Sequence, residues 1–209
     1  MDILKFFIFA KLAGVFVLQI MGQFKKIDNP IFSSIYRTYI DSLYRYGINL
    51  GYTHDTCLDA IQDVFYNLYI SNAITKVENL KYYLFRCLKN RLFDIHKSQK
   101  KEILNIDIND QYFNIEVSLM DSIIEQEKQK MIIDKIESLL KQLTNRQREA
   151  IYLRYIQEME YDDIGKLLNM SGHSVKQLVY RGISRLRQNP DIDLSLFLVV
   201  LAIKMMQES

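Results

Sequence analysis

The sequence contains very little proline and glycine, with two prolines and seven glycines among 209 residues. These two residues weaken helices most, and few segments show the alternation of apolar and polar residues that marks a half-buried strand. The composition therefore argues against a strand-rich protein and predicts an all-α fold. With 49% hydrophobic and 25% charged residues, the chain is long enough for one or two domains, each with its own core.

Cysteine and histidine are also scarce. The two cysteines, Cys57 and Cys87, show no CxxC spacing and lie on helix faces that we expect to be buried, which is typical of the reducing cytoplasm. The three histidines are isolated and form no metal-ligand set. The sequence lacks a glycine-rich phosphate loop, paired carboxylates and a nucleophile triad. We therefore expect no catalytic residue, metal, cofactor or small-molecule substrate.

No uncharged apolar run reaches the ~18 residues of a transmembrane helix. The N-terminal extension, residues 1–24, is apolar but is interrupted by Lys5, Lys11 and Gln19. It has neither the leading positive region nor the cleavage site of a signal peptide. It is a helix that docks on the rest of the protein, an interfacial anchor, or sequence upstream of a true start at Met21. The first and third interpretations are favoured over the anchor.

The C-terminal tail, residues 189–209, is apolar between Leu194 and Ile203, a run too short to cross a bilayer comfortably. Such a run must be covered. It pairs with the N-terminal extension, docks on a regulatory protein or touches a membrane, and the sequence does not choose among these.

The stretch from Tyr161 to Arg187, YDDIGKLLNMSGHSVKQLVYRGISRLR, predicts two helices joined by a tight turn. The first helix carries an apolar stripe at helical spacing: Ile164, Leu167 and Leu168. Asn169 tolerates the left-handed conformation that ends a helix, and Ser171 is a good N-cap for the next one. Gly165 lies where a second helix must approach closely.

The second helix of this pair has two different faces. Its apolar face consists of Val175, Leu178, Val179, Gly182 and Leu186. The opposite face carries no acid and presents His173, Lys176, Gln177, Tyr180 and Ser184, flanked by Arg181 and Arg185. Readout of the DNA major groove requires such a face on a rigidly held helix. The alternative is a helical hairpin with a merely solvated face. Taken together, the features favour a helix-turn-helix that binds duplex DNA.

Three helices are expected earlier in the chain, from Pro30 to near Gly47, from Thr53–Asp55 onward, and from about Asn79 to His96. Their predicted core stripes are Ile35, Tyr36, Tyr39, Ile40, Leu43 and Tyr44; Leu58, Ile61, Phe65 and Leu68; and Leu80, Tyr83, Leu84, Cys87, Leu88 and Ile95. The second helix also has an acidic outer face of Asp55, Asp59, Gln62, Asp63 and Tyr66. That face is either solvated surface or a surface that binds a basic partner protein.

The other face of the third helix mixes aromatic and basic side chains: Tyr82, Phe85, Arg86, Lys89, Phe93, His96 and Lys97. Residues 81–101 hold seven lysines and arginines against one acid, Asp94. This mixture suits unstacked bases against a phosphate backbone. The alternative is that the aromatic rings pack under a neighbouring helix, and side-chain chemistry alone leaves the two interpretations even.

Residues 102–133 form a predicted linker in which the charge reverses, since residues 102–134 contain eight acids and two bases. The linker is a solvated tether, the commoner case, or an acidic shield over the basic surfaces. A helix is expected from about Asp121 to Leu143 and another from Arg146 to Ile156. Thr144 and Gln147 have capping-box spacing before the latter.

Two blocks of the chain resemble known sequence motifs. The stretch TNRQREAIYLRYIQEMEYDDIGKLLNMSGHSVKQLVYRGISRLRQ is similar to region 4 of bacterial RNA polymerase sigma factors. Residues 35–101, with LDAIQDVFYNLY and LKYYLFRCLKNRLFDIHK, resemble region 2. Their order, with no intervening domain, is similar to the extracytoplasmic-function (ECF) subgroup. The resemblance implies two helical domains, residues 25–101 and 134–188, in a cytoplasmic sigma factor that starts transcription.

The resemblance also implies partners and site residues. Asp59, Gln62 and Asp63 would bind the clamp coiled coil of core RNA polymerase, and the flap would engage the C-terminal module. The −10 element of promoter DNA would be held, in melted form, by Asn79, Arg86, Lys89, Asn90 and Lys97. The −35 element would be read by His173, Lys176, Gln177 and Tyr180, with Arg181 and Arg185 on phosphates. An anti-sigma factor is a further expected partner.

The chain departs from the family pattern at two positions of the recognition helix. Gly182 stands where the family often has alanine, and Leu178 stands where it often has arginine, which removes a phosphate contact. A different class, a regulator with an N-terminal sensor domain, is disfavoured because a sensor has no use for the aromatic and basic face of the third helix. A scaffold or membrane-surface protein would leave the 161–187 pattern unexplained.

Overall fold

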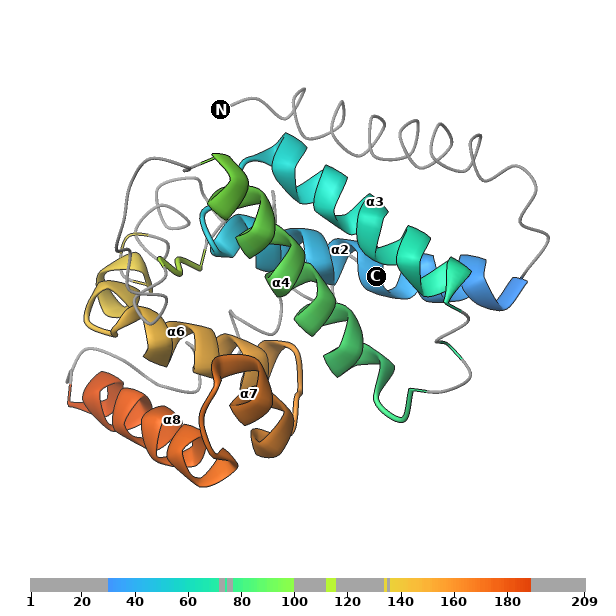
Figure 1. Cartoon of the computed structure of the whole chain (residues 1–209). Helices are drawn as coiled ribbons and strands as arrows, with labels where there is room; N and C mark the ends of the chain where they lie inside the picture. The colour runs from blue at the N-terminus through green and yellow to red at the C-terminus, as the bar shows by residue number, and fades with distance from the viewer. Residues whose placement is uncertain are drawn as a thin grey trace, which may run out of the picture.

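The computed structural model describes residues 30–71, 74, 77–99, 112–115, 134 and 136–188 (Figure 1). Within these ranges every regular element is a helix, which confirms the all-α prediction. None of the helices in the described ranges is both long and apolar enough to cross a bilayer. The predictions for the N-terminal extension, most of the linker, the start of the 121–143 helix and the C-terminal tail fall outside the described residues.

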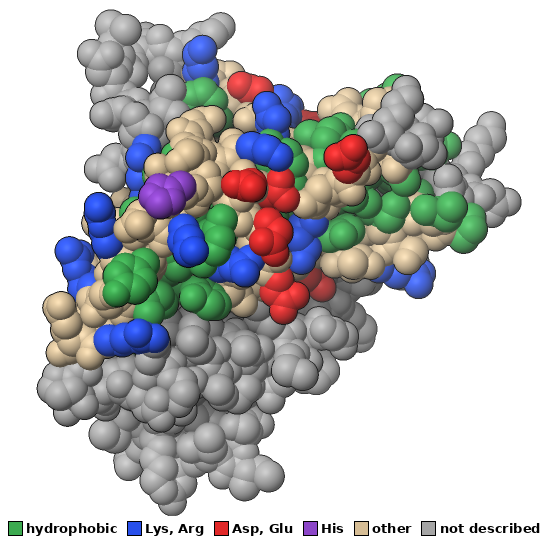
Figure 2. Space-filling view, turned by 90° about the horizontal axis from the view of Figure 1, so that it is seen from below, with side chains coloured by type: hydrophobic (Ala, Val, Ile, Leu, Met, Phe, Trp, Pro, Cys, Tyr) green, Lys and Arg blue, Asp and Glu red, His purple; other side chains and the backbone are tan. Residues whose placement is uncertain are grey.

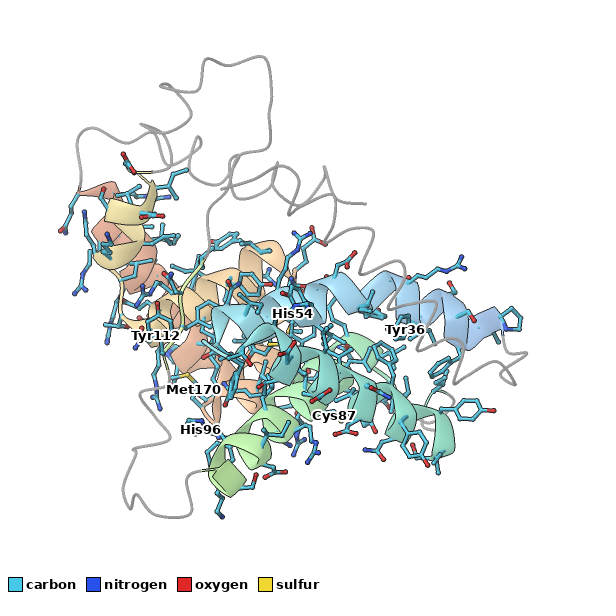
Figure 3. All side chains as sticks on the ribbon, turned by 90° about the horizontal axis from the view of Figure 1, so that it is seen from above. Tyr36, His54, Cys87, His96, Tyr112 and Met170 are labelled. Carbon is cyan, nitrogen blue, oxygen red and sulfur yellow. The ribbon has the colours of Figure 1, made fainter. Side chains whose placement is uncertain are left out.

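The N-terminal half is a bundle of α2 (Pro30–Asn49), α3 (His54–Ile70) and α4 (Leu80–Gln99). α3 begins where expected, and Thr53 caps it, because its hydroxyl accepts a hydrogen bond from the backbone N–H of Thr56 at 3.4 Å. Tyr36 of α2 lies against α3 (Figure 3), where its ring centroid is 4.6 Å from that of Phe65. The predicted stripes therefore do face one another across this bundle.

Some details of these stripes differ from the sequence prediction. Leu58 is half-buried rather than part of the core, and Phe85 and Leu92 of α4 are completely buried. α2 ends at Asn49, two residues beyond Gly47 and close to the expected end. A Cβ atom at Gly47 would lie 2.7 Å from the Sγ atom of Cys57, so this glycine serves the close approach of α3 to α2.

The C-terminal half contains α6 (Asn145–Ile151), a π-helix (Tyr152–Ile156), α7 (Tyr161–Leu168) and α8 (Gly172–Arg187), preceded by helical residues 136–141. The capping box is confirmed: Gln147 N–H donates to the Thr144 hydroxyl at 3.2 Å, and Thr144 N–H donates to Gln147 Oε1 at 3.1 Å. The helix expected over 146–156 widens into the π-helix, which ends where Gln157 N–H donates to the Tyr152 carbonyl at 3.0 Å.

The described part of the linker, residues 112–115, is not a solvated tether, and that expectation is wrong here. Phe113 is completely buried and packs against the rings of both Tyr46 and Tyr152, with centroid distances of 6.1 Å and 5.5 Å. The backbone N–H of Asn114 donates to the carbonyl of Asn49 at 2.8 Å. The linker therefore joins both halves into one continuous core, with α4 between α3 and the C-terminal helices (Figure 1).

We expect the folding stability of this shared core to fall at alkaline pH as the buried hydroxyl of Tyr152 ionises. Burial raises the pKa of Tyr152 from 10.0 to about 12, despite a hydrogen bond from the Gln157 amide to its hydroxyl at 3.0 Å. Because the folded pKa lies above the unfolded one, the contribution is complete below pH 10.0 and is lost as pH rises through about 12. A shift of this size corresponds to roughly 3 kcal/mol of unfolding free energy.

Urea unfolding of the wild type and of Tyr152→Phe at a series of alkaline pH values measures this contribution. The phenylalanine variant should lose less stability than the wild type across that pH range. Tyr155→Phe is the matched control, because Tyr155 is 44% exposed. Parallel pH curves for the wild type and Tyr152→Phe would contradict the assignment.

Candidate nucleic-acid interface

The turn between α7 and α8 has the geometry that the sequence predicts. Asn169 ends α7 with φ 55° and ψ 48°, in the left-handed region, and Met170 N–H donates to the Gly165 carbonyl at 2.8 Å. Ser171 caps α8 by accepting from Ser174 N–H at 3.0 Å. A Cβ atom at Gly165 would lie only 2.6 Å from the Met170 carbonyl oxygen. The turn therefore fixes the direction of α8 relative to α7.

α8 buries one face and exposes the other. Its buried residues are Val175, Val179, Gly182, Ile183 and Leu186, whereas Leu178 is only half-buried. The exposed residues include every predicted base or phosphate contact on this helix: His173, Lys176, Gln177, Tyr180, Arg181 and Arg185. Tyr180 is 66% exposed. Seen from below (Figure 2), lysines and arginines surround a histidine on the side where α8 lies.

One of these cations has an intramolecular partner. Arg185 Nη1 donates to the carbonyl of Gln142 at 3.0 Å, so its guanidinium ties α8 to the end of the helical residues 136–141. The exposed face of α8 can form hydrogen bonds with base edges and phosphates, and no acid on the helix opposes a polyanion.

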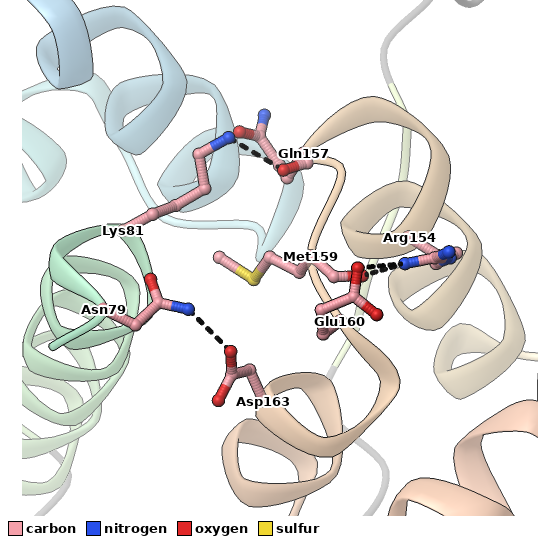
Figure 4. Close-up of polar contacts among 7 residues, drawn as sticks. All are labelled: Asn79, Lys81, Arg154, Gln157, Met159, Glu160 and Asp163. Atoms are coloured by element: carbon pink, nitrogen blue, oxygen red, sulfur yellow. Dashed lines mark hydrogen bonds and ion pairs between the residues drawn. The ribbon is translucent and has the colours of Figure 1, made fainter.

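The aromatic and basic face of α4 is partly covered by the C-terminal helices. Asn79 caps α4, since its Oδ1 accepts from Tyr82 N–H at 3.1 Å, and its Nδ2 donates to Asp163 Oδ2 at 2.6 Å (Figure 4). The ammonium of Lys81 donates to the carbonyl of Gln157 at 2.9 Å (Figure 4). The N-terminal end of α4 is thus fastened to α7 and to the loop before it.

A second fastening lies at Glu149 of α6. Its Oε1 accepts from the Tyr46 hydroxyl at 2.6 Å and from Lys89 Nζ at 2.8 Å. Glu149 is 4% exposed. Burial, with the Glu149 charge as the second cause, raises the pKa of Tyr46 well above its usual value. Arg86, Asn90 and Lys97 are exposed on the same helix as Lys89.

Comparison with known proteins identifies a family model and several proteins that are similar to this chain. The family model "Sigma-70, region 4" matches residues 133–186, which include α6, α7 and most of α8. The ECF RNA polymerase sigma factor SigM of Bacillus subtilis is 24% identical over 154 residues, covering 73% of this chain and 91% of SigM. SigW of the same organism, also an ECF sigma factor, is 24% identical over 181 residues, covering 79% and 92%. The region 4 match and the likeness to SigM and SigW support an ECF sigma factor, that is, an RNA polymerase sigma factor of transcription initiation.

A solved structure has the same fold. The sigma factor RpoE of Bartonella quintana, crystallised with the anti-sigma factor NepR, superposes with a TM-score of 0.52 at 22% identity. The match covers 79% of this chain and 99% of RpoE. The likeness extends over both halves of the sigma factor, which agrees with the all-α architecture.

The surface predicted to contact polymerase lies on α3 of the sigma factor. Asp59 is exposed, and Gln62 and Asp63 are half-buried. Asp63 Oδ2 forms an ion pair with Arg91 Nε at 2.6 Å, so one of the two acids is shared with α4. This site, like the assignment of DNA contacts on α4 and α8, stays a prediction.

Sequence analysis missed the acceptors that hold α4, namely Glu149, Asp163 and the Gln157 carbonyl. No local pattern marks them, because Glu149 lies 60 residues from Lys89 and 103 from Tyr46. It also left the role of the α4 aromatics open. Phe85 is in the core, whereas the half-buried Tyr82 has the Arg86 guanidinium 5.9 Å from its ring centroid.

Proposed function

We propose that this sigma factor directs core RNA polymerase to promoters by contacting DNA at two separate elements. α8 reads base edges of the −35 element with His173, Lys176, Gln177 and Tyr180, while Arg181 and Arg185 contact phosphates. The observation that carries the proposal is the exposed face of α8, which presents donors and cations without an acid. Such a face matches the pattern of acceptors in the major groove.

The −10 element is bound by α4 once its strands separate. Arg86, Asn90 and Lys97 are exposed for this purpose, and Asn79 and Lys89 join them after leaving Asp163 and Glu149. Unstacking a base costs a few kcal/mol, on the order of what stacking on an aromatic ring returns. Because Asp163 and Glu149 hold Asn79 and Lys89 in this structure, the two halves must move apart before α4 can hold a melted strand.

Core polymerase supplies the chemistry and this chain supplies specificity, so we assign it no catalytic role. Asp59, Gln62 and Asp63 bind the clamp coiled coil, and the C-terminal module binds the flap. An anti-sigma factor is a proposed partner, supported by the likeness to RpoE, which was crystallised with the anti-sigma factor NepR. The division into modules at residues 25–101 and 134–188 and action in the cytoplasm belong to the same proposal.

Transcription in vitro from genomic DNA with core polymerase tests this function. The wild type should initiate at defined promoters. Lys176→Ala should lower initiation at those with the preferred −35 base by about 10- to 100-fold, because a good base contact is worth about 1–3 kcal/mol of discrimination. Arg181→Ala should instead weaken binding to all sequences and lower the salt slope by about one unit.

Lys141→Ala is the matched control, since Lys141 is an exposed lysine outside the proposed interface. If Lys176→Ala, Arg181→Ala and Arg86→Ala all initiate like the wild type, the residue assignments are wrong. If the wild-type chain fails to associate with core polymerase, the proposed function itself is wrong.

A further inference from the structure

A cleft of about 290 Å³ opens between α4 and the C-terminal helices. The residues that give it its chemical character are Arg86, Lys89 and Phe93 of α4, Arg146 and Glu149 of α6, and Lys166 of α7. Both halves of the molecule therefore contribute charged side chains to one space, and the cleft exists only while they are packed together.

The cleft is lined by more basic than acidic side chains. Four cations and one carboxylate line it, and with Asp163, which pairs with Lys166, the net charge of the group is +2. The carboxylate, Glu149, is already bound by Lys89 at 2.8 Å and by Tyr46. Asp163 lies 3.2 Å from Lys166, but Asp163 also accepts from Asn79 and the Lys166 side chain is 61% exposed. The surplus of cations is thus a property of the interface between the two halves.

Two of the cations meet at one aromatic ring. Arg86 Cζ lies 5.9 Å and Lys166 Nζ 5.5 Å from the ring centroid of Tyr82. One cation comes from α4 and the other from α7. The ring attracts both cations, and Arg86 Nη1 also donates to the Tyr82 hydroxyl at 2.9 Å. An anion in the cleft can form charge-assisted contacts with such cations.

We propose that this cleft binds a small polyphosphate, of the class of a nucleoside diphosphate or triphosphate. A linked pair or trio of phosphates suits the net charge of +2 and the several donors of the walls. The half-buried ring of Phe93 and the amides of Asn90 and Asn169 provide apolar and polar surface for the remainder of such a ligand.

The size of the cleft favours a small ligand over a strand of nucleic acid. Its volume of about 290 Å³ is near the lower limit of small-molecule sites, which begin at about 300 Å³. α6 and α7 form one of its walls, whereas α4 can hold a melted strand only after these helices move away. The binding itself does not depend on promoter recognition.

A ligand held by cations of both halves must stabilise the packed arrangement, because it binds that arrangement better than a separated one. The packed arrangement keeps Asn79 on Asp163 and Lys89 on Glu149. Bound polyphosphate therefore opposes release of the α4 face. This last effect rests on the proposed function, whereas ligand binding does not.

Isothermal titration of the full chain with inorganic tripolyphosphate and with ATP, at constant ionic strength, tests the proposal. Both should bind one site. Lys166→Gln and Arg86→Gln should each weaken binding by about tenfold, the loss expected for one charge-assisted contact. Lys141→Gln and Arg37→Gln remove the same charges at exposed positions away from the cleft and should leave the affinity unchanged. Circular dichroism establishes that each variant is folded.

Equal affinities for the wild type, Lys166→Gln and Arg86→Gln would overturn the proposal, as would an equal loss in the two control variants. A short single-stranded oligonucleotide forms a separate arm of the experiment. If it binds with dependence on Lys166 and Arg86 while tripolyphosphate and ATP do not bind, the cleft is a nucleic-acid site and the proposal fails. A DNA-binding defect in Lys176→Ala tests promoter recognition separately.

Discussion

Glu149→Ala should lower the free energy of unfolding by about 3 kcal/mol, because it leaves the half-buried Lys89 ammonium without its partner. The side chains of Lys89 and Glu149 are 18% and 5% exposed and lie 2.8 Å apart. The Tyr46 hydroxyl, which donates to the same carboxylate at 2.6 Å, would also lose its acceptor. Urea denaturation followed by circular dichroism measures the change.

The substitution should also loosen the packing of the two halves, since Tyr46, Lys89 and Glu149 belong to α2, α4 and α6. Small-angle scattering should show a larger radius of gyration for Glu149→Ala. Glu137→Ala is the control, because Glu137 is exposed and its loss should change stability by less than about 0.5 kcal/mol.

A combined variant separates the role of charge from that of shape. Tyr46→Phe, Lys89→Met and Glu149→Leu together replace the whole polar cluster by apolar groups, which is often neutral or stabilising. The triple variant should therefore recover most of the stability that Glu149→Ala loses. If Glu149→Ala is as stable as Glu137→Ala, the cluster does not hold the halves together.

The parts of the fold that sequence analysis predicted correctly depend on short-range interactions. The caps at Thr144 and Ser171 and the left-handed Asn169 involve residues at most a few positions apart. The buried face of α8 likewise follows from spacing along one helix. The exposed face of α8 could be assigned from the sequence except for Ser184, which is half-buried, and the buried Ile183 was not predicted.

The parts that could not be predicted depend on partners far apart in the chain. Phe113 lies in a segment whose polar composition suggests solvation, and its burial becomes evident only when Tyr46 and Tyr152 are brought together beside it. The aromatic and basic face of α4 gave a similar problem. Its periodicity separates two sides of a helix, but it cannot show that both sides are packed, as the buried Phe85 and the half-buried Lys89 require.

This difference also shapes the candidate site. On α8 the functional and structural residues occupy opposite faces, so one pattern identifies both. On α4, Asn79 and Lys89 hold the C-terminal helices with the groups proposed to hold DNA. Such a residue contacts a protein side chain in the packed state and DNA in the proposed open state. The sequence shows no separate pattern for each contact, and only the three-dimensional structure reveals the packed one.

Gly165→Ala should disrupt the helix-turn-helix, because the added methyl group meets backbone atoms that have no freedom to move aside. Its Cβ would lie 2.6 Å from the Met170 carbonyl oxygen, 3.0 Å from Gly172 N and 3.1 Å from the Ser171 carbonyl carbon. The left-handed Asn169 and the hydrogen bond from Met170 N–H to the Gly165 carbonyl fix this part of the turn. Such overpacking costs about 1–3 kcal/mol of stability.

Gly165→Ala should reduce DNA affinity more than it reduces folding stability, because α8 must be displaced from α7 to relieve the contact. Loss of two base contacts, each worth about 1–3 kcal/mol, lowers affinity for a duplex by roughly 100-fold or more. Fluorescence anisotropy with promoter duplex measures this loss. Gly182→Ala is the matched control, since the one tight contact of its Cβ is with the flexible Cδ1 end of Ile151, at 2.9 Å. Equal DNA affinity in the two alanine variants would mean that the turn does not set the position of α8.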